Sequence, residues 1–176
     1  MKKYVAFLRG INVGGNKKVP MGELKKVLEK SGLKNIKTIL ASGNVVFESD
    51  SSIRELQSMI PSAIENKFRF PVPVLLRTHK DIQKLVALNP FKGINVTPKT
   101  RLYVTFLSQK LDDKSSANYI FPDKSFKIIS SLDRTVESVL DLSRSNSPDA
   151  MSALEKLYGK NITTRNWNTI VKICNL

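Results

Sequence analysis

The residues with the most evident chemistry in this 176-residue chain form one stretch, Arg9-Gly10-Ile11-Asn12-Val13-Gly14-Gly15-Asn16-Lys17-Lys18. It lies between an apolar run and the first clearly amphipathic segment. A glycine-rich turn between a strand and a helix lets backbone N–H groups converge on an anion, to which lysine and arginine add positive charge. The stretch therefore predicts an anion site. The ligand contacts predicted here are Arg9, Gly10, Asn12, Gly14, Gly15, Lys17 and Lys18.

Two known phosphate-binding motifs do not fit this stretch. Gly10 and Gly15 have the spacing of a P-loop, but Asn16 stands where that motif needs lysine, and Lys17 where it needs serine or threonine. The dinucleotide-binding fingerprint fails because no parallel βαβ unit follows. The alternative interpretation is a tight turn in which glycines provide the backbone angles and the lysines only face solvent.

A second candidate lies near the end of the chain, at Thr163-Thr164-Arg165-Asn166. We expect these residues at the start of the last helix, where free N–H groups and the helix dipole favour an anion that Arg165 could clasp. Arg165 and Asn166 therefore join the predicted ligand contacts. The alternative is that Asn166 or Thr164 is an ordinary helix cap and that Arg165 forms a salt bridge.

The sequence offers no constellation for catalysis or metal binding. His79 and Cys174 are the only residues of their types, so a zinc site or a cysteine-histidine pair finds too few partners. Adjacent carboxylates such as Asp112-Asp113 would diverge on a helix. An RNA-recognition-motif surface is disfavoured because the expected third strands lack paired aromatics. The sequence therefore leaves the catalytic residues, if the protein is an enzyme, unassigned, and we predict no metal and no cofactor.

The net charge of +14 is the least ordinary feature of the composition. Residues 1–47 hold ten Lys or Arg and only two acidic residues, so more than half of the positive excess lies there. Such a field attracts nucleic acid or phosphorylated small molecules, although solubility alone would also explain it. The lone cysteine and the absence of a long apolar run predict a cytoplasmic protein without a membrane segment.

The hydrophobic pattern predicts the same order of elements twice. The first half consists of strand, helix, strand, strand, helix and strand, followed by an extra helix after Thr78. Residues 89–99 contain two prolines and a glycine without periodicity, which predicts a linker. The expected elements are strands at 4–8, 34–40, 44–48, 71–77, 101–107, 125–129, 135–142 and 162–164, and helices at 20–31, 78–88, 111–121, 148–158 and 166–174, with a further helix that opens at Ser52 and includes Ile64.

This order predicts an α+β fold with two ferredoxin-like (βαββαβ) halves, each an antiparallel sheet with helices on one face. The predicted domains are residues 1–88 with the extra helix, a linker at 89–99, and residues 100–176 with the terminal helix. Pro61 is expected to kink or reset the second helix.

Four motifs resemble one family. Arg9 to Gly15, Ser42-Gly43-Asn44-Val45-Val46-Phe47, Asn89-Pro90-Phe91 and Thr164-Arg165-Asn166-Trp167-Asn168-Thr169 are similar in type and order to the bacterial domain-of-unknown-function family 1697. The resemblance extends over nearly the whole chain. It implies two ferredoxin-like α+β halves and no settled activity, so it assigns no catalytic residue.

Three functions remain open on the sequence. The first is binding of a phosphate-bearing ligand or nucleic acid through the stretch 9–18. The second is an enzyme that acts on a phosphorylated small molecule in a cleft between the halves, with Arg9 and Arg165 on the phosphate. The third is a structural or partner-binding protein of unspecified oligomeric state.

Overall fold

The computed structural model describes residues 1–15, 17–111 and 119–176. The chain divides into two compact units, the first comprising Met1–Lys84 with Lys172–Leu176 and the second Leu85–Val171. Within the described residues, no helix has the length and apolar character needed to cross a membrane.

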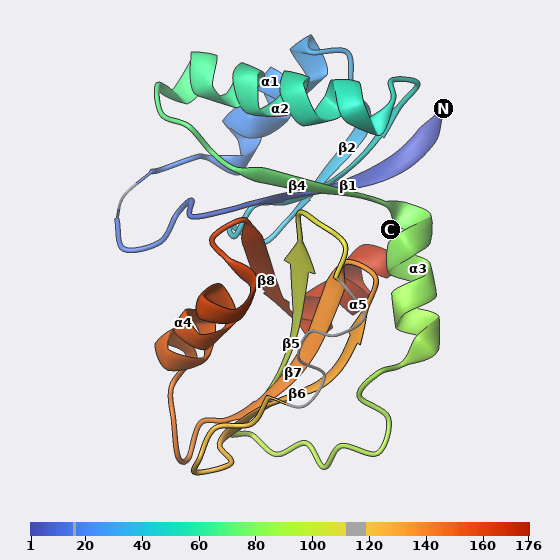
Figure 1. Ribbon diagram of the computed structural model, residues 1–176. Coiled ribbons are helices and arrows are strands. Elements are labelled where there is room, and N and C mark those ends of the chain that lie inside the picture. Colours follow the sequence, from blue (N-terminus) through green and yellow to red (C-terminus); the bar gives the residue numbers. More distant parts are fainter. Residues whose placement is uncertain (16, 112–118) are drawn as a thin grey trace. The chain divides into compact units, whose positions relative to one another are not determined.

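The first unit is a four-stranded antiparallel sheet with two helices on one face (Figure 1). The strands follow the order β2-β3-β1-β4. Its elements are β1 (Lys2–Leu8), α1 (Met21–Lys30), β2 (Lys34–Ile39), β3 (Asn44–Ser49), α2 (Ile53–Phe68) and β4 (Val74–Thr78).

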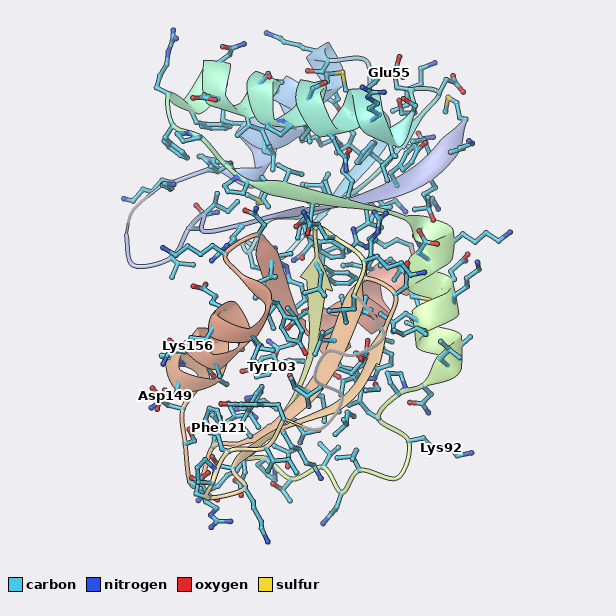
Figure 2. The ribbon with its side chains drawn as sticks, in the orientation of Figure 1. Glu55, Lys92, Tyr103, Phe121, Asp149 and Lys156 are labelled. Atoms are coloured by element: carbon cyan, nitrogen blue, oxygen red, sulfur yellow. The ribbon has the colours of Figure 1, made fainter. Side chains whose placement is uncertain are left out.

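The core of this unit consists of apolar residues at alternate positions of the strands and at helical spacing in α1 and α2. Leu24 and Leu28 of α1, and Leu56, Ile60 and Ile64 of α2, pack on alternate residues of the sheet. Ser52 opens α2 with a capping box, because its hydroxyl accepts from the Glu55 N–H while the Glu55 carboxylate accepts from the Ser52 N–H. Glu55 is labelled in Figure 2. Helix α2 therefore buries one face, formed by Leu56, Ile60 and Ile64, against the sheet.

Pro61 does not interrupt α2, which continues as one helix through it. Proline removes one backbone donor, but Ile60 and Ile64 are both fully buried on either side of it. Their packing offsets the missing hydrogen bond.

Helix α3 (His79–Leu88) follows β4 directly. Thr78 caps it by accepting from the Asp81 N–H at 3.2 Å. The buried His79 donates from Nε2 to the carbonyl oxygen of Ile173 at 3.0 Å, and Lys3 Nζ donates to the Leu176 carbonyl at 3.0 Å. These bonds attach the last residues of the chain to the first unit.

The second unit repeats this strand order, since its sheet reads β6-β7-β5-β8. Its elements are β5 (Thr100–Leu107), β6 (Phe126–Leu132), β7 (Thr135–Asp141), α4 (Ser147–Tyr158), β8 (Ile162–Asn166) and α5 (Trp167–Cys174). Helix α4 packs on the sheet face that carries Tyr103, Leu107, Val136 and Leu140. Tyr103, labelled in Figure 2, bonds to Ser147 at the start of α4 at 2.9 Å.

The α+β class with two four-stranded antiparallel sheets is confirmed. Each strand order is that of a ferredoxin-like βαββαβ unit, with the first strand of each half central and the fourth at an edge. The helix predicted at 111–121 falls largely on residues 112–118, outside the described residues. Strand β8 extends two residues past the predicted 162–164, so the last helix begins at Trp167.

Candidate anion-binding site

The predicted loop leaves the sheet at the end of the central strand β1. The Leu8 N–H donates to the Gly43 carbonyl at 2.8 Å, and the Arg9 N–H donates to the Pro73 carbonyl at 2.9 Å. The loop is therefore anchored at its start to the β2–β3 hairpin on one side and to the segment before β4 on the other. It ends at Pro20, the residue before α1.

Asn12 holds the middle of the loop in place. Its Nδ2 donates to the Val19 carbonyl at 3.0 Å and to the Ala41 carbonyl at 2.8 Å, and its Oδ1 accepts from the Val19 N–H at 2.8 Å. The side-chain amide thereby closes the loop on itself and joins it to the hairpin. Because both ends of this amide are occupied within the protein, we assign it to shaping the loop.

Gly10, Gly14 and Gly15 have φ values of +69°, +62° and +77°. A Cβ at any of them would meet no heavy atom within 4 Å, so their flanks are open. No described residue accepts a hydrogen bond from the N–H of these three glycines. Exposed amide donors on an anchored loop are the groups that an anion can use.

The two loop lysines are exposed, and Lys17 makes contacts beside the loop. Lys17 Nζ lies 3.3 Å from the Pro71 carbonyl oxygen and 6.0 Å from the centre of the Phe70 ring. Lys18 follows immediately and is also exposed. Arg9 is half-buried at the other end of the loop.

The first turn of α1 adds further donors. Pro20 occupies the N-cap position and makes no side-chain capping bond, so the first N–H groups of α1 have no side-chain acceptor from that residue. Glu23 lies in this turn, but Lys67 approaches its carboxylate at 3.2 Å and Lys26 at 3.9 Å. The hydrogen bond and charge of Lys67 lower the pKa of Glu23.

Sequence reasoning missed the part that the β2–β3 hairpin plays in the loop. At Gly43, with φ +76°, an added Cβ would lie 2.8 Å from Ile11 Cδ1 and 2.8 Å from Leu8 Cβ. Gly43 therefore permits close contact between hairpin and loop. The available signal was the resemblance, because the motifs at 9–15 and 42–47 are the two segments that meet here.

Arg165 and Asn166 are consecutive residues of β8, so their side chains point to opposite faces of the second sheet. Arg165 Nη1 donates to Thr163 Oγ1 at 2.8 Å and to the Thr164 carbonyl at 2.9 Å, and burial lowers its pKa to about 10. Asn166 lines a hollow at the start of α5. The two side chains do not form one site. Both belong to the second unit and the loop to the first.

The other two resemblance motifs also meet. Phe91 of the motif 89–91 packs edge-to-face on Trp167 of the motif 164–169, with 5.1 Å between ring centres. Each unit thus contains one pair of motifs in contact.

Comparison with known proteins agrees with this fold. A family model described as a protein of unknown function (DUF1697) matches residues 1–127, so the motif at 164–169 lies beyond the matched range. The solved structure of a conserved bacterial protein, SP0830 from Streptococcus pneumoniae, is 23% identical, with a TM-score of 0.71 over 99% of this chain and 97% of that one. No curated protein matches. Since the family model covers more than half of the chain, the protein belongs to the DUF1697 family.

Proposed function

We propose that this protein binds the phosphate groups of a nucleic acid through the loop at residues 9–18. The observation that carries the proposal is the set of exposed N–H groups at Gly10, Gly14 and Gly15, for which the described residues supply no acceptor. Asn12 fixes the loop before a ligand arrives, which lowers the ordering cost of binding. Lys17 and Lys18 add charge beside these donors.

The charge distribution favours a polymer over a small phosphorylated compound. The net charge is +14, and residues 1–47 carry ten basic and two acidic residues. A polyanion with many phosphates is attracted by many of these charges at once, whereas a small ligand interacts with only a few of them. We place this activity in the cytoplasm.

Binding without turnover is the form of the proposal that the titratable groups support. The pKa values of Glu23 and Glu55, in the first turns of the two helices of the first unit, are lowered by hydrogen bonds and, at Glu23, by the charge of Lys67. An acid–base catalyst near the loop would need a pKa shifted toward neutrality.

The test is a titration of a fluorescently labelled single-stranded oligonucleotide, followed by anisotropy at several salt concentrations. We expect Lys17→Gln/Lys18→Gln to weaken binding about tenfold and to reduce the slope of log K against log salt by about 1.4, since each lost phosphate contact removes about 0.7. The matched control is Lys80→Gln/Lys84→Gln, which removes two exposed lysines of α3 and the same net charge.

Equal weakening by the two double variants would overturn the loop assignment, because net charge alone would then govern binding. Stabilisation by one small phosphorylated compound that persists at moderate salt and is lost in Lys17→Gln/Lys18→Gln would favour the enzyme hypothesis instead. If no anion binds, the structural or partner-binding hypothesis becomes the leading one.

A further inference from the structure

The hollow at the start of α5, of about 300 Å³, lies within the second unit where β5 begins, β8 ends and α5 begins. Ligand pockets span roughly 300 to 1,000 Å³, so its size suits a small molecule. Its lining combines one arginine, two asparagines, two threonines and the tryptophan of the chain with the apolar side chains of Val96 and Leu102.

Arg101 is anchored within this hollow in a way that leaves one side of its guanidinium group available. Its Nη1 donates to the Pro98 carbonyl at 2.8 Å and to the Thr100 carbonyl at 3.0 Å, which uses both hydrogens of that nitrogen. Within the described part of the chain, nothing accepts from Nε or Nη2. The edge formed by these two nitrogens has the geometry for a bidentate contact with a phosphate or carboxylate.

The start of α5 contributes polar side chains that have no hydrogen-bond partner among the described residues. Thr169 lines the hollow with only 6% of its surface exposed, and its hydroxyl makes no hydrogen bond to another described residue. The side chains of Asn166 and Asn168 also line the hollow and likewise find no partner among the described residues. Side-chain hydroxyl and amide groups without a partner in the protein, beside a helix N-terminus, are donors and acceptors that an anionic ligand can use.

Trp167 supplies an aromatic wall to the same hollow. Phe91 packs against its ring at an interplanar angle of 63°, which holds the indole in one orientation. The indole remains half-buried and lines the hollow. A planar ring can stack on an indole held in this way.

We propose that this hollow binds a small ligand that joins a planar aromatic ring to a phosphate group, of which a mononucleotide is the simplest form. The Arg101 edge and the first turn of α5 hold the phosphate. Trp167 stacks on the ring, and the asparagine amides bond to its polar edge. This site uses no residue of the loop at 9–18, so this proposal does not depend on the function proposed above.

The test uses the fluorescence of Trp167, the one tryptophan of the chain. The full-length protein is titrated with adenosine monophosphate, with adenosine, which lacks the phosphate, and with ribose 5-phosphate, which lacks the ring. We expect saturable quenching by the mononucleotide, and affinity at least tenfold weaker for adenosine and for ribose 5-phosphate in competition. If adenosine binds as tightly as the mononucleotide, or if no compound quenches, the proposal is wrong.

Two variants locate the site. Asn168→Asp places a carboxylate in the first turn of α5, where a negative charge stabilises the helix, so the protein folds but repels the phosphate. We expect at least a tenfold loss of mononucleotide affinity with an unchanged or raised melting temperature. Arg101→Gln should lose affinity similarly, with circular dichroism as the check on folding.

The matched control is the loop variant Lys17→Gln/Lys18→Gln, which should quench as the unmodified protein does. Unchanged affinity in Asn168→Asp would overturn the proposal. A loss in the loop variant equal to that in Asn168→Asp would overturn it too, because the quenching would then report on general anion binding.

Discussion

Asn12 and the glycines around it have different roles although they share one motif. The Asn12 side chain makes three hydrogen bonds within the protein from a backbone with φ of 56°, while the N–H groups of Gly10, Gly14 and Gly15 have no acceptor among the described residues. We infer that the asparagine holds the conformation of the loop, whereas the glycine N–H groups donate to a ligand. The sequence predicted all of them as ligand contacts, and for Asn12 a direct contact stays a prediction.

Replacement of Asn12 tests whether its side-chain amide stabilises the loop. Asn12→Ala loses three hydrogen bonds and places a Cβ-bearing residue without a polar group at positive φ, so we expect about 2 kcal/mol of destabilisation in urea unfolding. Asn12→Gly keeps the backbone angle accessible and should recover part of that loss. If both variants are as stable as the unmodified protein, the amide does not hold the loop.

Glu137 has a carboxyl group whose ionisation opposes folding. It is buried on β7, where Ser130 Oγ donates to Oε2 at 2.6 Å and Oε1 has no hydrogen-bond partner among the described residues. Burial raises the pKa of Glu137, and hydrogen bonds from the side chains of Ser130 and Thr135 offset only part of this. The neutral form is therefore favoured in the folded state more than in the unfolded state.

The sign of the resulting pH dependence follows from this raised pKa. The unfolded carboxyl titrates near 4.5, so the contribution of Glu137 to stability is intact below that pH and is lost as the pH rises through the folded pKa. We expect Glu137→Gln to raise the melting temperature relative to the unmodified protein more at pH 8 than at pH 4. A larger benefit at pH 4 than at pH 8 would show that the pKa is not raised.

At the scale of elements, the contact between the hairpin and the loop depends on Gly43. Gly43→Ala would add a Cβ 2.8 Å from Ile11 and Leu8 at a residue with φ +76°, so we expect about 3 kcal/mol of destabilisation from steric overlap and backbone strain. The matched control is Gly14→Ala, which has a similar φ of +62° and open space, and should cost about 1 kcal/mol. Thermal or urea unfolding compares the two, and equal losses would mean that the packing contributes nothing.

Elements with local signals could be predicted from the sequence. The capping box at Ser52 and Glu55, the helical spacing of buried residues in α1 and α2, and the apolar run of β1 all depend on neighbours in the chain. The end of β8 depends instead on a distant strand, since Asn166 pairs with Tyr103 of β5. For that reason the sequence placed Arg165 and Asn166 together at a helix start, whereas the strand directs them to opposite faces.

At the scale of the whole molecule, the repeated element order predicted two sheets, and both have the same strand order. The sequence could not predict which motifs meet, because neither the contact of Gly43 with Ile11 nor that of Phe91 with Trp167 leaves a periodic signal. It also could not find the hollow at α5, whose lining comes from residues 96–102 and 166–169. Local sequence patterns contain no information on which distant segments of the chain come into contact.

The positive charge is a property of the whole chain, whereas the loop donors are a property of three residues. The central claim is that phosphate groups bind to the N–H groups of Gly10, Gly14 and Gly15, and a titration with a single-stranded oligonucleotide, followed by ¹H–¹⁵N nuclear magnetic resonance, tests it most directly. Gly32 and Gly159 are the internal controls, because their N–H groups already donate to the carbonyls of Glu29 and Glu155. We predict saturable shifts of the three loop glycines with little change at the two controls. Unshifted loop glycines in the presence of bound oligonucleotide would contradict the account.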